Sequence, residues 1–215
     1  MSVQVAERDA RVEAVGDAFF DAASRLDSNG MREALVECSA VHGVDVVVAD
    51  VIVPALRRIG DLWEEGRLSV LHEHVASQVI RSVVDDFGQS ADREGRPAVV
   101  LACPPGELHE LPSHLFAAML RVRGWVPIVL GANTPWRATV RSLSSFRAQA
   151  CLISGIRAGS LASRGAGLSR MARSVCVLCV SLSSRLDPRI VFSRGSHSQP
   201  LRARGRAASS GARRP

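Results

Sequence analysis

The loop from Cys103 to Glu110 contains the residues best suited to binding a metal. It reads Cys-Pro-Pro-Gly-Glu-Leu-His-Glu, with a histidine at position 109 and Glu107 two residues before it. A neutral imidazole can bind a transition metal, and a neighbouring carboxylate can orient the ring and increase its basicity. The alternative is a solvated polar loop, and the residue types taken by themselves favour that alternative.

A second group of candidates, Trp63, Glu73 and His74, flanks a predicted turn at Gly66. An indole surface beside a carboxylate and an imidazole suits a flat organic ligand with polar edges. The alternative is that Trp63 belongs to the core and that Glu73 and His74 form a solvated helix face. This segment, taken alone, favours the second interpretation.

Four amphipathic helices are predicted around this second group. Apolar residues recur at helical spacing, and polar or glycine-containing segments separate the helices. The predicted ranges are 7–26, 31–41, 44–65 and 69–88. Pro54 is expected to kink the third helix or to begin its second half. Short turns between helices favour an antiparallel four-helix bundle.

A different pattern follows the polar linker 89–96. Short apolar runs, typical of buried strands, alternate with helical segments. The strands are expected at 98–103, 126–130 and 150–154, and the helices at 112–123 and 135–147. This order predicts a doubly wound parallel sheet, Rossmann-like in class. Ligands of such sheets bind beyond the carboxyl ends of the strands, where the Cys103–Glu110 loop lies.

The charge is divided unevenly between the predicted regions. Residues 1–154 have a net charge of −5 and residues 155–215 one of +11, which together give +6. We expect a helical cap at 1–90, an α/β domain at 97–182 and a disordered Arg-rich tail at 193–215, with a fourth strand at 174–182 and a short fifth strand at 190–192. Because the excess positive charge lies beyond residue 154, the basic pI does not indicate a specific DNA-binding face.

Composition excludes several classes of protein. The longest apolar runs, 98–103 and 175–180, are much shorter than the roughly 18 residues of a membrane span. Five cysteines, most of them in apolar surroundings, fit reduced thiols and a cytoplasmic location. No catalytic triad, phosphate-binding loop or acid/base pair is visible, so we do not expect an enzyme.

Together the two candidate sites resemble one family. The segment Ile59–His74, with Trp63, nine intervening residues and then Glu73-His74, resembles the helical cap of the MerR-type photoreceptor regulators that bind adenosylcobalamin. Glu107-Leu108-His109 resembles the Glu/Asp-x-His-x-x-Gly signature of cobalamin-binding domains. The segments 130–135 and 154–156 lie at the positions where that family has the ends of its second and third strands. The resemblance covers about residues 5–156.

This resemblance implies a role for each candidate. Cobalamin would lie between the bundle and the sheet domain, with His109 as the lower cobalt ligand and Glu107 as its orienting partner. Ser154 would meet the buried nucleotide tail. Trp63 and Glu73, with His74 beside them, would cover the upper axial group. This group is 5′-deoxyadenosyl in the photoreceptor branch. Methylcobalamin, which has a methyl group there, is the alternative cofactor. Light that breaks the cobalt–carbon bond would loosen the cap and change the oligomeric state. Bundle ends of this kind often associate, so a homo-oligomer is expected, and without a DNA-binding module any transcriptional effect would act through a regulatory protein partner.

The sequence departs from the family pattern at four places. Pro112 replaces the glycine of the signature, and Glu64 follows Trp63 where some light-sensing members have a histidine. No helix-turn-helix precedes the bundle. Residues 155–215 contain one acid, Asp187, among 61 residues, and we interpret this segment as a shifted reading frame or a truncation. In that case the sheet would lack two strands and leave an edge unpaired.

Three functions remain open at this point. The first is a cobalamin-binding sensory or regulatory module. The second is a corrinoid carrier for methyl transfer, which shares bundle and sheet but needs an uncovered upper face, so the Trp63 and Glu73-His74 cap favours the first. The third is a degenerate interaction module that no longer binds cofactor, which Pro112 and the altered C-terminal segment favour.

Overall fold

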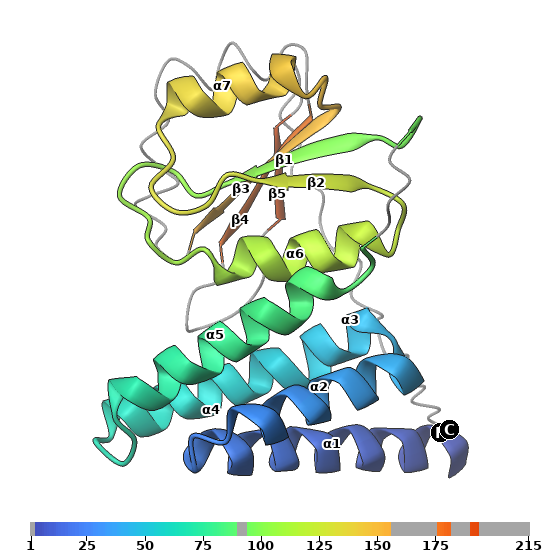
Figure 1. The fold of residues 1–215 in the computed structure, drawn as a ribbon, viewed down its shortest axis with the longest axis vertical. Coiled ribbons are helices and arrows are strands. Elements are labelled where there is room, and N and C mark those ends of the chain that lie inside the picture. The colour runs from blue at the N-terminus through green and yellow to red at the C-terminus, as the bar shows by residue number, and fades with distance from the viewer. Residues whose placement is uncertain (1–2, 90–93, 156–175, 182–189, 194–215) are drawn as a thin grey trace, which may run out of the picture.

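The computed structural model describes residues 3–89, 94–155, 176–181 and 190–193. Its described part combines a helical bundle with a sheet that has a helix on each face (Figure 1). The predicted fold class, a helical bundle followed by an α/β domain with a parallel sheet, is confirmed. Within the described residues, no helix is both long enough and apolar enough to span a membrane.

Four helical segments form the bundle, at the positions that the periodicity predicts. They are α1 (Val3–Ser24), α2 (Ser28–His42), the continuous segment α3 (Val44–Val46), η1 (Val47–Ile52) and α4 (Val53–Glu64), and α5 (Val70–Asp86). Pro54 lies in the first turn of α4, directly after the wider π-helical turn of η1. Because proline has no backbone N–H and its ring collides with the preceding turn of an α-helix, a locally widened helix accommodates it without ending the segment.

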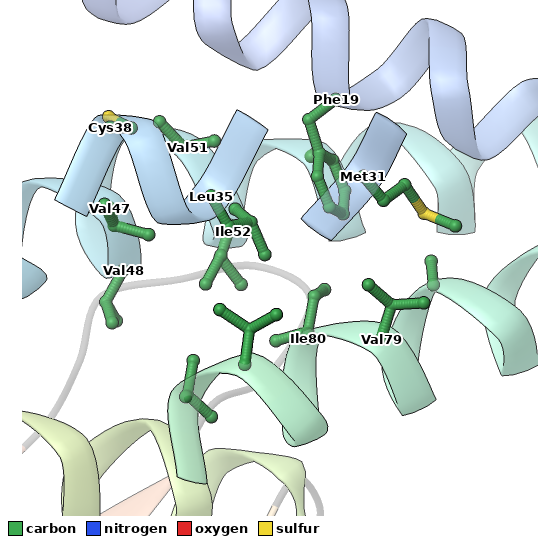
Figure 2. Close-up of a cluster of buried hydrophobic side chains, with 14 of the residues drawn as sticks. Phe19, Met31, Leu35, Cys38, Val47, Val48, Val51, Ile52, Val79 and Ile80 are labelled. Atoms are coloured by element: carbon green, nitrogen blue, oxygen red, sulfur yellow. The ribbon is translucent and has the colours of Figure 1, made fainter. Parts of the chain in front are cut away.

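The bundle core is made by the apolar stripes of these helices. Figure 2 shows side chains of α1, α2, η1 and α5 converging on one another. Phe19, Leu35, Ile52 and Ile80 are all fully buried in this cluster. The same cluster includes Leu115 and Ala118 of α6 (Leu111–Arg121). Since Ala117 of α6 packs in the cluster on the sheet, α6 lies between bundle and sheet and positions one against the other.

The start of α2 provides a test of the bundle's local stability. Asp27 is the N-cap, and its Oδ1 accepts a hydrogen bond of 3.0 Å from the backbone N–H of Gly30. Replacing Asp27 with Ala leaves that N–H without its side-chain partner, so we expect the free energy of unfolding to fall by about 1 kcal/mol. Urea denaturation measures this change. Asp21→Ala, an exposed aspartate within α1, is the matched control and should change stability by less than about 0.5 kcal/mol; an equal loss in both variants would contradict the cap.

The sheet contains five strands in the order β2-β1-β3-β4-β5. They are β1 (Ala98–Ala102), β2 (Val126–Val129), β3 (Ala150–Gly155), β4 (Cys176–Ser181) and β5 (Ile190–Ser193). The first four run parallel, with β1 paired to β2 and β3, and β3 paired to β4. Helix α6 covers one face and α7 (Trp136–Ser145) covers the other (Figure 1), so the sheet is doubly wound.

The fourth and fifth strands expected at 174–182 and 190–192 are present as β4 and β5, so the expectation that the sheet lacks two strands is wrong. No direction was predicted for the last strand, and β5 runs antiparallel to β4. The short connection from Ser181 to Ile190 explains the direction, because a parallel crossover needs a dozen or more residues. The predicted disordered tail begins at Ser193, which ends β5, and residues 194–215 lie outside the described part.

Candidate functional site

Glu107 and His109 are paired at the carboxyl end of β1. Glu107 Oε1 lies 2.7 Å from His109 Nδ1 and accepts a hydrogen bond of 3.1 Å from the His109 backbone N–H. The carboxylate is buried, with 1% of its side chain exposed, whereas the His109 side chain is 53% exposed. An imidazole that donates its Nδ1–H to this carboxylate has its free lone pair on Nε2. That is the donor a transition metal requires.

Neighbouring backbone determines where Glu107 lies. The Asn133 backbone N–H donates to the Glu107 carbonyl at 2.8 Å, and the Gly106 backbone N–H donates to Asn133 Oδ1 at 2.9 Å. Gly155, the last residue of β3, lies against the carboxylate. A Cβ atom at position 155 would be only 2.9 Å from Glu107 Oε2. Asn133 and Gly155 therefore position Glu107 although neither was among the predicted site residues.

Glu110 joins the bundle to this loop. Its carboxylate pairs with the guanidinium of Arg81 on α5 and accepts a hydrogen bond of 3.0 Å from the Ala132 backbone N–H. Gly131 is needed beside it, because its φ is +85° and a Cβ there would be 2.9 Å from Glu110 Oε2. One carboxylate thus holds together α5, the start of α6 and the loop after β2. Arg81 and Glu110 were not among the predicted site residues. The loops that contain Glu110 and Ala132 each follow a parallel strand, and both were expected at the same edge of the sheet.

Ser154 lies in a buried polar cluster at the same edge. Its Oγ is 2.6 Å from Ser113 Oγ and 3.7 Å from Cys103 Sγ, and all three residues are fully buried. Burial raises the pKa of the Cys103 thiol, while its hydrogen bonds to the two serines act in the opposite direction. Pro112 lies in the first turn of α6, where a missing N–H removes no helical hydrogen bond.

Trp63, Glu73 and His74 lie around the turn between α4 and α5. Glu73 Oε2 is 2.6 Å from His74 Nδ1, and Glu73 Oε1 accepts a hydrogen bond of 2.8 Å from Ser77 Oγ. Trp63 is 49% exposed, so the interpretation of this residue as core is wrong. The structure brings Glu73 and His74 into contact and leaves the indole surface of Trp63 accessible. His72 is engaged otherwise, in a capping box with Ser69 at the start of α5.

Helix α5 connects the two groups of candidates. Glu73, Ser77 and Arg81 are spaced four residues apart and therefore lie along one side of the helix. Arg81 pairs with Glu110, the residue that follows His109. The axial rise from Glu73 to Arg81 is about 12 Å at 1.5 Å per residue. A polar stripe on α5 therefore runs from the Trp63 turn to the His109 loop.

Comparison with known proteins connects this architecture to cobalamin. Residues 15–85 match the family model described as a B12 binding domain. The HTH-type transcriptional repressor CarA of Myxococcus xanthus is 27% identical over 147 residues, which is 68% of this chain and 49% of the repressor. The HTH-type transcriptional repressor CarH of the same organism is 34% identical over 100 residues, which is 46% of this chain and 33% of that repressor. The chain thus spans half or less of the length of these relatives.

A solved structure supports the fold. The monomethylamine corrinoid protein of Methanosarcina barkeri superposes with a TM-score of 0.55 at 15% identity, covering 81% of this chain and 86% of that one. This likeness confirms the combination of bundle and sheet. The family match and the two repressors, independently of this structure, confirm the resemblance to cobalamin-binding regulators that the sequence motifs predict.

Proposed function

We propose that this chain, which contains a B12 binding domain, is a cobalamin-binding regulatory module that responds to light through adenosylcobalamin. The observation that carries the proposal is the Glu107–His109 pair at the carboxyl end of β1. A half-exposed imidazole oriented by a buried carboxylate is a prepared metal ligand. The ion pair from Glu110 to Arg81 places this ligand beside the helix that carries Glu73 and His74.

Each candidate has a distinct role in this proposal. His109 would hold the cobalt through Nε2, and Glu107 would fix the orientation and the tautomer of the ring. Ser154 would contact the nucleotide tail at the sheet edge. Trp63 would cover the other face of the cofactor with its exposed indole, and Glu73, which contacts His74 and Ser77, would lie beside it.

The regulatory step is a change in the cap. Bound adenosylcobalamin supplies a cobalt–carbon bond that light can break, and the protein supplies the binding site and a movable cover. Trp63 lies at the end of α4 next to the turn into α5 and is exposed enough to move without disturbing the core. Loss of the group it covers would release that turn and alter a surface available to a second copy or a regulatory partner.

Dark loading followed by illumination tests this function. The full chain is mixed with adenosylcobalamin in the dark, desalted, and examined by absorption spectroscopy and size-exclusion chromatography before and after illumination. We expect retained cofactor, a light-induced spectral change and a change in elution volume. Cofactor that washes off folded protein would contradict the proposal and leave the degenerate interaction module.

A corrinoid methyl carrier is the second candidate. It is supported by the fold shared with the monomethylamine corrinoid protein. Retention of methylcobalamin but not of adenosylcobalamin, with no change in elution volume after illumination, would favour this candidate over the sensor.

Gly155 provides a test of how Glu107 is held. Replacing it with Ala places a Cβ atom 2.9 Å from Glu107 Oε2, so the buried carboxylate that orients His109 must shift. Because displaced outer partners of metal ligands typically cost 10–100-fold in affinity, we expect cobalamin binding to weaken about tenfold. Equilibrium titration followed by absorption measures the change. Gly16→Ala, in α1 with open space around its Cβ position, is the control and should leave affinity unchanged; equal affinity in the two variants would contradict this role of Gly155.

A further inference from the structure

A cavity opens on the bundle, between α1, α4 and the turn that follows α4. Its volume is about 580 Å³, which is within the usual range for small-molecule sites. Four apolar residues from these three elements contribute to its lining: Phe20, Pro54, Leu62 and Leu68. They provide a surface against which the hydrocarbon part of a ligand can pack.

Three arginines surround this apolar surface. Arg57 and Arg58 come from α4 and Arg67 from the following turn, and Asp61 is the one acid in the lining. Arg58 is held in place, because its guanidinium lies 3.6 Å from the centroid of the Phe20 ring and 3.0 Å from Asp17 Oδ1. Within the described part of the chain, Arg57 forms no ion pair. Arg67 Nη1 lies 3.3 Å from Glu65 Oε2, an exposed pair that uses one of the five N–H donors of its guanidinium. The cavity thus presents the guanidinium of Arg57 and the remaining N–H donors of Arg67.

The cavity is separate from the proposed cofactor site. None of Trp63, Glu73, His74, Glu107 and His109 lines it. On a helix with 3.6 residues per turn, Trp63 projects roughly 140° away from Arg58 and roughly 160° away from Asp61. Trp63 and the cavity therefore lie on different sides of α4.

We infer that this cavity binds a small organic anion, with a carboxylate or phosphate held by Arg57 and Arg67 and an apolar group packed on Phe20, Leu62 and Leu68. Guanidinium groups match both kinds of anion through paired N–H donors. A ligand here would contact Arg67 and Leu68, which belong to the same turn that Trp63 precedes. The site does not depend on the proposed cobalamin function.

Calorimetric titration of the cofactor-free full chain tests the inference. Phenyl phosphate and benzoate are the two anionic probes, and benzyl alcohol is the neutral probe. We expect at least one anion to bind with a Kd of about 1 mM or tighter, which is weak but measurable for so few atoms, while benzyl alcohol does not bind. Nuclear magnetic resonance shifts at Phe20, Leu62 and Leu68 would place the bound anion, and the stronger of the two probes distinguishes phosphate from carboxylate.

Matched arginine variants decide whether the cavity is responsible. Arg57→Gln and Arg67→Gln should each raise the Kd about tenfold, the loss of one charge-assisted hydrogen bond. Arg141→Gln, an exposed arginine of α7, should leave the Kd unchanged. Binding that is equal for benzyl alcohol and the anions, equal in all three variants, or absent for both anions would overturn the inference. The elution volume should be the same with and without the probe. A dimer whose interface covers this cavity would also overturn the inference.

Discussion

Replacing His109 with Ala is expected to weaken cobalamin binding more than about 100-fold. Loss of an outer partner of a metal ligand costs up to about that factor, and this substitution removes the ligand itself. The absorption spectrum of any cofactor that remains should lose the features that the imidazole imposes. Equilibrium titration in the dark, followed by absorption, measures both effects. Because the His109 side chain is 53% exposed, the substitution should leave the fold intact.

A matched histidine separates this effect from a general loss of imidazole. His42 lies in the last turn of α2 and is not among the candidates for the site. His42→Ala should bind cobalamin with the affinity and spectrum of the unmodified chain. Far-ultraviolet circular dichroism confirms that both variants are folded. Unchanged affinity and spectrum in His109→Ala would contradict the assignment of this residue as the cobalt ligand.

Replacing Glu107 with Gln should weaken cobalamin binding by about 10–100-fold while preserving the volume of the side chain. An amide cannot stabilise the His109 ring as a carboxylate does, and its NH₂ group can turn toward Nδ1 and favour the wrong tautomer. The expected result is weaker binding with an altered spectrum. The measurement is the same dark titration.

Stability must be measured alongside affinity for this variant. Glu107 is 1% exposed, and its Oε1 accepts from the His109 backbone as well as contacting the ring. Thermal unfolding of the cofactor-free protein therefore shows how much of the effect is structural. Glu37→Gln, an exposed glutamate of α2, is the control and should alter neither property. A variant at Glu107 that loses stability but keeps full affinity would show that the carboxylate only supports the loop.

The parts of the fold that depend on local pattern could be predicted from the sequence. The apolar spacing around Phe19, Leu35 and Ile80 predicts the helices whose stripes meet in the bundle core. The π-helical turn before Pro54 and the antiparallel direction of β5 were not predicted. The π-helical turn depends on how a proline is accommodated inside a packed helix. The direction of β5 depends on the length of the connection between β4 and β5.

The candidate site was predictable where its residues are close in sequence. Glu107 and His109 are two positions apart, so their pairing follows from the loop itself. The contacts between Arg81 and Glu110 and between Ser113 and Ser154 join elements far apart in the chain. These contacts depend on how α5 packs on α6 and on how α6 begins over the sheet edge, which no local pattern contains.

The most direct measurement identifies the nitrogen bound to cobalt. The chain is produced with histidine labelled by the heavy nitrogen isotope, loaded with unlabelled cobalamin in its cobalt(II) form, and examined by electron paramagnetic resonance. The unpaired electron couples to the axial nitrogen, so a protein histidine gives doublet splitting and the cofactor's own unlabelled base gives triplet splitting. We predict the doublet, and its loss in His109→Ala. A triplet in the labelled, unmodified chain would show that cobalamin keeps its own base as ligand and would contradict the account.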